Sequence, residues 1–293
     1  MQLSRLQATA IGLVAPLCWA MSVGLVREIT TALGQTAGAA LLCGIGALFL
    51  LIIYGRPRLG DYRPAYLVFG IGAAVLTEFF FVPSVATAAN SRQTIEVGMV
   101  IYLWPCLTIL AAVAINGQKA RAYLPIGFVL CFTGIAVVLS GGEELNIVAI
   151  TRNFTGNPSC YLMAFAGACC WAIYSALTRR MANGRNPVVI IFSLNALVFT
   201  LLYFLGVGER AVLSISSFGL AAFAAFVMAS AYAAWTFGVM RGSITLLAIA
   251  SYFTPVLSCL FSAWLLGEGL EPSFWSGVVL VVSGSVVCWL ATR

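Results

Sequence analysis

The chain has 293 residues, of which 62% are hydrophobic and only 8% are charged, and its formal net charge is +6. Soluble domains carry about 25% charged residues, so this composition excludes a soluble fold. It predicts a polytopic membrane protein.

A membrane-spanning helix needs about 20 predominantly apolar residues. In chain order we expect ten such helices, near residues 8–28, 36–54, 65–88, 96–116, 123–141, 159–179, 188–207, 218–239, 246–266 and 273–291. The first run has full length and nine others follow it, which predicts a retained helix rather than a cleaved signal peptide. The runs are continuous rather than alternating, which excludes a transmembrane β-barrel. The predicted fold class is therefore all-α integral membrane. Residues 141–158 form the longest connection and are expected to act only as a connector.

The basic residues predict the orientation of the helices. With the N-terminus in the cytoplasm, 11 of the 15 Lys and Arg residues fall on the cytoplasmic side and 4 fall outside, in agreement with the positive-inside rule. The cytoplasmic set is Arg5, Arg56, Arg58, Arg63, Lys119, Arg121, Arg179, Arg180, Arg185, Arg241 and Arg293, and the outer set is Arg27, Arg92, Arg152 and Arg210. Ten helices then place both termini in the cytoplasm.

The use of cysteine and histidine excludes several kinds of site. Eight of the nine cysteines fall within apolar runs, where a free cysteine behaves as a small hydrophobe. The absence of histidine removes Ser-His-Asp triads, Cys-His dyads and histidine metal sites. No G-x-x-x-x-G-K loop for ATP is present. We therefore expect no enzyme activity, no metal and no cofactor.

Two stretches that lie 150 positions apart read alike, VIYLWPCLTIL at Val100–Leu110 and ASYFTPVLSCL at Ala250–Leu260. An offset of 152 also aligns Trp19 with Trp171. Other pairs at the offset of 150 are Tyr102 and Tyr252, Pro105 and Pro255, Leu107 and Leu257, Gly117 and Gly267, Gly127 and Gly277, and Gly134 and Gly284. The pattern predicts two five-helix repeats, residues 1–150 and 151–293.

An odd number of helices in each repeat means that the second repeat enters the membrane from the opposite side. Inverted repeats are typical of secondary transporters, which bind substrate near the midplane where the repeats meet. The matched prolines, Pro105 and Pro255, are then expected to be hinge or gating residues. The alternative is that both prolines mark tolerated kinks, since membrane helices accept proline with help from neighbours.

The arrangement of five plus five helices, Gly267-Glu268 at the end of the ninth, and Gly277 and Gly284 in the tenth resemble the drug/metabolite transporter superfamily, in its EamA-like ten-helix exporter branch. The resemblance covers essentially the whole chain. One departure is Gln118, which stands where the second half has Glu268.

Within that branch, Trp19, the run Tyr102–Pro105 and Trp171 are similar to residues of the bacterial aromatic amino acid exporters. The resemblance implies a single central cavity, export of amino acids and a location in the bacterial inner membrane.

Aromatic residues at mid-depth indicate where a substrate would bind. Tryptophan and tyrosine normally gather at the membrane interfaces, but Trp19, Trp104 and Trp171 lie near the centres of their predicted helices. Lipid offers no partner to a buried indole or phenol, so a cavity lined by these rings is expected, with helix packing as the alternative. Such rings suit an aromatic side chain or an ammonium. The predicted substrate-binding set is Trp19, Glu78, Phe81, Tyr102, Trp104, Trp171, Tyr174, Ser251 and Tyr252.

Glu78 is the one acidic residue placed inside a predicted helix rather than at an end. A charge at the bilayer centre costs about 2.5–3.5 kcal/mol even on lenient scales, so such residues usually face a cavity. Glu78 could pair with a substrate ammonium or carry a coupling proton, or it could be a protonated residue hydrogen-bonded between helices. Asn195 is interpreted as a polar contact between helices.

The favoured hypothesis is a secondary transporter that exports amino acids, aromatic ones and others such as threonine and methionine, by alternating access. A nucleotide-sugar or other small-metabolite carrier would need Lys or Arg in the cavity, and only a helix-end residue such as Arg179 could reach in. A non-transporting structural protein fits the composition but not the repeat. The expected partners are the small-molecule substrate and the lipid bilayer, with protons as an open question, no nucleic acid, and a monomeric state.

Overall fold

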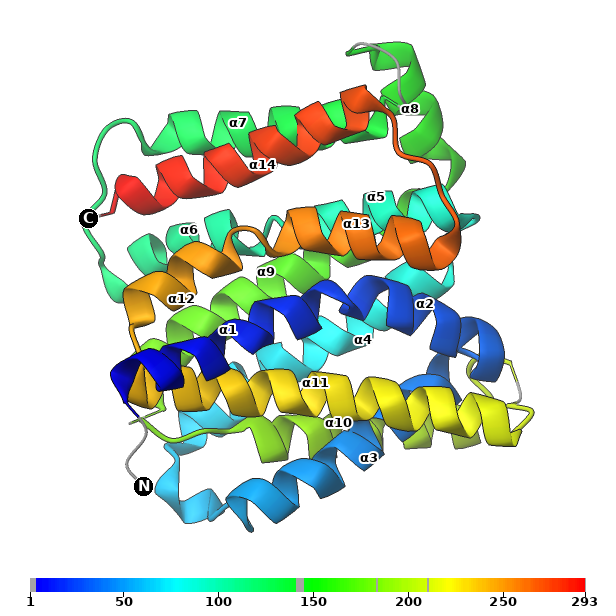
Figure 1. The fold of residues 1–293 in the computed structure, drawn as a ribbon, viewed down its shortest axis with the longest axis vertical. Helices are drawn as coiled ribbons and strands as arrows, with labels where there is room; N and C mark the ends of the chain where they lie inside the picture. Colours follow the sequence, from blue (N-terminus) through cyan, green and yellow to red (C-terminus); the bar gives the residue numbers. More distant parts are fainter. Residues whose placement is uncertain (1–3, 141–144, 183, 210, 293) are drawn as a thin grey trace. The chain divides into compact units, whose positions relative to one another are not determined.

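The computed structural model describes residues 4–140, 145–182, 184–209 and 211–292. Arg210 and Arg293, which were used for the predicted orientation, and residues 141–144 of the predicted connector lie outside the described residues. Within the described ranges the chain is helical and contains no strand (Figure 1). In chain order the helices are α1 (Arg5–Ala20), α2 (Ser22–Leu33), α3 (Gln35–Tyr54), η1 (Leu59–Asp61), the π-helical turn η2 (Tyr66–Ile71), α4 (Gly72–Ala86), α5 (Ser91–Ile101), α6 (Trp104–Asn116), α7 (Leu124–Leu139), α8 (Ile147–Gly156), α9 (Pro158–Met181), α10 (Val188–Phe204), α11 (Ile215–Arg241), α12 (Ile244–Ser251), α13 (Thr254–Leu266) and α14 (Pro272–Leu290).

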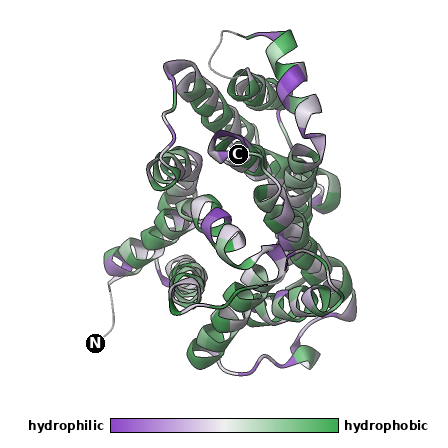
Figure 2. Cartoon of the chain, turned by 90° about the vertical axis from the view of Figure 1, so that its right-hand side faces the viewer, coloured by the Kyte–Doolittle hydropathy of each residue, from purple (hydrophilic) through white to green (hydrophobic). Residues whose placement is uncertain are grey.

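The helices are apolar along most of their length (Figure 2). Among the described residues, six helices are long and apolar enough to cross a membrane, or seven if α1 and α2 form one span bent by 45°. The apolar helices α7, α10 and α13 are shorter. Large apolar side chains also face outward, such as Ile52, which is 84% exposed, and Phe204, which is 80% exposed. Exposed apolar surface of this kind fits a membrane environment. The all-helical membrane class is thus supported, and the number ten remains a prediction.

Three of the predicted helices are broken in the structure. The predicted helix 8–28 divides at Met21, whose N–H bonds the Cys18 carbonyl three residues back rather than four. The predicted helices 96–116 and 246–266 divide at Tyr102–Leu103 and Tyr252–Phe253. In each of these two, a proline is the second residue of the new helix, where its missing N–H removes no helical hydrogen bond.

The chain forms two compact units. Unit 1 contains Met1–Tyr62 and Gly184–Ser258, and unit 2 contains Arg63–Asn183 and Cys259–Arg293. Each unit therefore contains helices from both halves of the sequence. The repeat boundary at residue 150 stays a prediction, because the units are defined by spatial contact and not by sequence similarity.

In unit 1, small residues let helices approach closely. A Cβ added at Gly12 of α1 would lie 2.9 Å from the Cα of Gly238 in α11 and 2.7 Å from the Leu247 side chain of α12. The Ser243 N–H donates to Thr9 Oγ1 at 2.8 Å, which ties the start of α12 to α1. Helix α3 packs on α10, where Gly46 makes room for the Phe192 ring. Close helix packing through glycine is common in membrane proteins.

In unit 2, α7 and α14 lie side by side (Figure 1) and pair through glycines. A Cβ at Gly127 would lie 2.8 Å from the Gly284 oxygen, and a Cβ at Gly134 would lie 2.6 Å from the Gly277 oxygen. The lower-numbered glycine of α7 meets the higher-numbered glycine of α14, so the helices are antiparallel. These four glycines are two of the pairs that the offset of 150 aligns. Equivalent helices of the two halves therefore face each other, with each glycine opposite the equivalent of its neighbour along the stripe.

The connector between the halves contains a helix that the sequence analysis did not predict. Helix α8 begins after Asn146, whose side-chain oxygen accepts hydrogen bonds from the Val148 and Ala149 N–H groups. An asparagine at this position satisfies backbone donors that the first turn leaves free. Its exposed face includes Ile147 and Val148, each 76% exposed.

Candidate functional site

Three of the predicted substrate-binding residues form an aromatic cluster in unit 2. The Trp104 and Trp171 rings meet edge-to-face with centroids 6.4 Å apart, and the Trp171 and Tyr174 centroids are 5.0 Å apart. Trp104 is the first residue of α6, and Trp171 lies near the middle of α9. The two tryptophans are only partly buried, whereas Tyr174 is buried. The cluster thus joins the centre of one span to the break in another.

Phe81 and Glu78 lie on α4, which packs against α9. The contact is made at Gly167, where a Cβ would lie 3.3 Å from the Thr77 oxygen and 3.6 Å from the Phe81 nitrogen. Gly167 and Trp171 are four residues apart and therefore share a face of α9. Phe81 is buried, and Glu78 is partly buried. Glu78 has no hydrogen bond or ion pair to any residue in the described part of the chain.

Trp19 belongs to a second aromatic cluster, which lies in unit 1. Its ring centroid is 5.5 Å from that of Tyr232 and 5.2 Å from that of Trp235, and Tyr232 in turn meets Phe192 at 5.4 Å. Tyr232 and Trp235 were not among the predicted residues, although they are three residues apart on α11 and therefore share a face. That spacing was the available signal.

Ser251 and Tyr252 also belong to unit 1 and lie at the break between α12 and α13. Ser251 is buried and Tyr252 is partly buried. Tyr102, which is buried, occupies the matching position in unit 2, at the break between α5 and α6. The predicted set is thus divided, with Trp19, Ser251 and Tyr252 in unit 1 and the other six residues in unit 2.

The two breaks have the same local hydrogen bonds. The Leu103 N–H donates to the Val100 oxygen at 3.1 Å, and the Phe253 N–H donates to the Ala250 oxygen at 3.0 Å. One turn later, Leu107 donates to Leu103 at 3.1 Å and Leu257 donates to Phe253 at 3.1 Å. Each residue number at the break between α12 and α13 equals the corresponding number at the break between α5 and α6 plus 150. Pro105 and Pro255 therefore stand directly after equivalent interruptions of the helix.

A buried polar network in unit 2 was not predicted as a unit. Glu96 is only 4% exposed, and its carboxylate accepts a hydrogen bond from the Tyr161 hydroxyl at 2.6 Å. Arg92 lies 3.4 Å from Glu96 and 3.7 Å from Glu271. The sequence assigned Glu96 to a helix end, but it could not show that Tyr161 of α9 would reach it.

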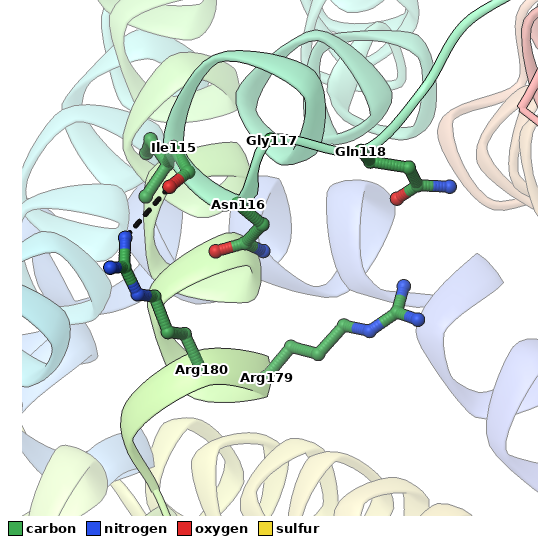
Figure 3. Close-up of a pocket in the computed structure, with 6 residues that line it drawn as sticks. All are labelled: Ile115, Asn116, Gly117, Gln118, Arg179 and Arg180. Carbon is green, nitrogen blue, oxygen red and sulfur yellow. Dashed lines mark hydrogen bonds between the residues drawn. The ribbon is translucent and has the colours of Figure 1, made fainter.

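A pocket of about 700 Å³ lies in unit 2 where α6 and α9 end (Figure 3). Its lining residues are Ile115, Asn116, Gly117, Gln118, Arg179 and Arg180. None of them belongs to the predicted aromatic set. Four of its six lining residues have polar side chains, and both arginines belong to the predicted cytoplasmic side.

The apolar spanning helices, the interruptions at matching positions and the antiparallel glycine pairing define a polytopic membrane protein built from repeats. Two segments of the chain, residues 7–140 and 158–290, each match the EamA-like transporter family. The chain belongs to this family and carries two copies of its domain. The resemblance seen in the sequence is thereby confirmed.

Curated relatives extend over essentially the whole chain. The aromatic amino acid exporter YddG of Salmonella typhimurium (strain 14028s) is 40% identical over 287 residues, covering 98% of each chain. The protein of the same name from Escherichia coli K12 is 40% identical over 291 residues, covering 99% of each. That of Ancylobacter novellus is 30% identical over 300 residues, covering 99% of this chain and all of the other.

A solved crystal structure matches with a TM-score of 0.68 and 26% identity, and the match covers 99% of both chains. The family and the names of the relatives identify a transporter and not an enzyme. Together with the apolar helices, they describe a multi-pass inner-membrane protein. The roles of the individual site residues remain predictions.

Proposed function

We propose that this protein exports amino acids, aromatic ones included, across the bacterial inner membrane by alternating access. The observation that carries the proposal is the position of aromatic residues beside mid-span helix breaks. Trp104 directly follows the break between α5 and α6, and Trp19 stands two residues before the break at Met21. Tyr252 forms part of the third break.

A break at mid-depth leaves backbone groups without their usual helical partners. Such backbone is tolerated within a membrane only where it is buried in protein or lines a water-filled cavity. Discontinuous helices near the midplane form the substrate sites of many secondary transporters. Aromatic rings at these breaks suit an aromatic substrate side chain, because edge-to-face and offset contacts contribute about 0.5–1.5 kcal/mol per ring pair. Threonine and methionine are proposed as further substrates.

The proposed roles of Glu78, Pro105 and Pro255 follow from their surroundings. Glu78 has no charged partner in the described part of the chain, so it is available to a substrate ammonium or to a coupling proton. Pro105 and Pro255 stand one residue inside α6 and α13, directly after the interruptions, where a proline disfavours an uninterrupted run of helical hydrogen bonds. Each break is then a bending point that opens one side of the membrane. With both termini in the cytoplasm, the inverted halves supply one such point for each side.

The direct test is efflux from proteoliposomes. Vesicles loaded with radiolabelled phenylalanine, tryptophan, threonine, methionine or UDP-glucose are compared for the wild type, Trp171→Ala and Trp171→Phe. Trp171→Ala removes two ring contacts, so we expect about tenfold weaker phenylalanine transport, equivalent to about 1.4 kcal/mol. Trp171→Phe keeps a ring and should lose less. The matched control is Trp264→Ala, because Trp264 is 76% exposed.

Each result decides between the functions under consideration. Saturable efflux of amino acids that weakens only in the Trp171 variants would support the proposal. Movement of UDP-glucose alone would replace it with a nucleotide-sugar carrier. If no solute moves, transport by the isolated chain is refuted. Comparison of the pH profiles of the wild type and Glu78→Gln tests coupling, since a coupling carboxyl group should lose its pH response when it becomes an amide.

A further inference from the structure

The polar pocket at the ends of α6 and α9 has the size and composition of a small-molecule site. Its volume of about 700 Å³ lies within the range of about 300–1,000 Å³ that is typical of such sites. It is made by the C-terminal ends of two helices of unit 2 that pack against each other. Asn116 Nδ2 donates to the Ala176 oxygen at 3.1 Å, and Arg180 Nη1 donates to the Ile115 oxygen at 2.8 Å. These bonds fix the walls of the pocket.

The two arginines of the pocket differ in what they do. Arg180 is engaged in closing the end of α6, through the Ile115 oxygen. Arg179 makes no hydrogen bond or ion pair with any residue that the structure describes, and its side chain is exposed. Figure 3 shows its guanidinium on the same side of the pocket as the amide of Gln118, with Asn116 between the two arginines. Arg179 is thus the group with free donors for a carboxylate, which guanidinium binds in a bidentate manner.

The two amide side chains of the pocket offer acceptors. Gln118 Nε2 donates to the Thr292 oxygen at 3.3 Å, and the Asn116 nitrogen donates to Ala176. Because the amide nitrogens are engaged in this way, the amide oxygens are left as acceptors. Asn116 Oδ1 is buried and has no hydrogen-bond partner among the described residues. Because this oxygen has no accessible surface, the acceptor open to a ligand is the oxygen of Gln118.

We infer that this pocket receives the amino acid zwitterion on the cytoplasmic side, before it reaches the aromatic residues. The inference rests on the proposed function and adds a recognition site to it. Arg179 binds the α-carboxylate, and the oxygen of Gln118 binds the α-ammonium. A zwitterion uses both the donors and the acceptors. A phosphate group, by contrast, would use only the guanidinium and leave the Gln118 oxygen unpaired.

The test measures transport from the cytoplasmic face in inside-out membrane vesicles. Uptake of radiolabelled phenylalanine gives KM and Vmax for the wild type, Arg179→Gln, Arg179→Lys and the control Lys119→Gln. Lys119 is exposed, follows the pocket directly and does not line it. We expect Arg179→Gln to raise KM about tenfold, as for one lost charge-assisted pair, with Vmax changed less than about twofold. Arg179→Lys should regain part of the affinity, and Lys119→Gln should match the wild type.

Two analogues of phenylalanine sharpen the test. Phenylalaninamide lacks the carboxylate, so its inhibition constant should be the same for the wild type and Arg179→Gln. 3-Phenylpropionate lacks the ammonium but keeps the carboxylate, so Arg179→Gln should weaken its inhibition. If Arg179→Gln has the KM of the wild type and its transport is still saturable, the pocket is not the amino acid site, and the proposed function stays intact. No saturable uptake by the wild type would overturn both.

A lipid headgroup is the competing occupant. The same variants are therefore compared in proteoliposomes of phosphatidylcholine alone and of phosphatidylcholine with phosphatidylglycerol. An effect of Arg179→Gln that is equal in both lipids supports the amino acid site. An effect confined to the anionic lipid assigns the pocket to a phosphate headgroup and overturns the inference.

Discussion

The glycine contact between α7 and α14 gives a prediction that can be worked out from distances. Gly134→Ala would place a Cβ 2.6 Å from the Gly277 oxygen and 2.8 Å from the Val281 nitrogen. Ordinary carbon–oxygen contacts begin near about 3.3 Å, so the helices would have to separate by roughly 0.7 Å. The neighbours include backbone atoms of α14, which cannot turn aside as a flexible side chain could.

The expected cost combines two opposing effects. Overpacking of a well-packed contact costs about 1–3 kcal/mol, and replacing a helical glycine by alanine returns about 0.5–1 kcal/mol. The difference spans roughly 0–2.5 kcal/mol, and because backbone atoms are among the close neighbours we expect a net loss of about 1–2 kcal/mol. At roughly 2–4 °C per kcal/mol for a larger chain, the Tm should fall by about 2–8 °C. Gly277→Ala should behave alike, because its Cβ would lie 2.7 Å from the Gly134 oxygen.

Thermal unfolding of the detergent-purified protein, followed by size-exclusion chromatography, measures the change. The matched control is Gly72→Ala, since Gly72 is also helical and a Cβ there would meet nothing within 4 Å. The double variant of Gly134 and Gly277 should lose less than the sum of the two single variants, because one separation of the helices serves both methyl groups. If Gly134→Ala unfolds at the same temperature as Gly72→Ala, the reasoning from the close contact is wrong.

Three further predictions concern single side chains or backbone positions. Tyr161→Phe removes the donor to the buried Glu96 carboxylate and should lower the free energy of unfolding by about 1–3 kcal/mol. Thermal unfolding measures the change, with Tyr203→Phe as the control because the Tyr203 hydroxyl has no partner among the described residues. Gly117→Ala should cost about 1–2 kcal/mol in the same assay from its left-handed φ of 65° alone, because a Cβ there meets nothing within 4 Å. Pro105→Ala should change stability by less than about 1 kcal/mol, since the proline is near the start of α6, but it should slow phenylalanine efflux. A loss of stability without a change in efflux would contradict the gating role.

The helical class could be predicted because apolar runs of about 20 residues have few other stable forms. The breaks within those runs could be located only in part. Pro105 and Pro255 indicated two of the interruptions, but their place after the break, and not within a kink, depends on the turns at Leu103 and Phe253. The division at Met21 has no proline at the break and no sequence signal that we used. Local hydrogen bonding, and not composition, decides where such a helix stops.

The candidate site shows a different limit. Mid-depth position identified Trp104, Trp171 and Tyr174, and the structure brings these three into contact. It could not identify Tyr232 or Trp235 as neighbours of Trp19, because their contact joins helices that are far apart in sequence. The polar pocket could not be predicted for the same reason, because its residues come from helices that are far apart in sequence. Its residues read separately as a helix end and as positive-inside charges.

The repeat is expressed in backbone geometry as well as in residue identity, and this bears on the mechanism. Gly117 and Gly267, which end α6 and α13, have φ angles of 65° and 66°, and the breaks at Tyr102 and Tyr252 share their hydrogen bonds. Helices α6 and α13 are therefore short segments, each with a break at its start and a left-handed glycine at its end. A segment bounded in this way can tilt with little loss of helical hydrogen bonding, since the run of helical hydrogen bonds is already interrupted at both of its ends. The segment, rather than the proline alone, is then the unit that alternating access would move. We therefore expect both Gly267→Ala and Pro255→Ala to slow phenylalanine efflux from proteoliposomes, and normal efflux by Gly267→Ala would contradict a moving segment.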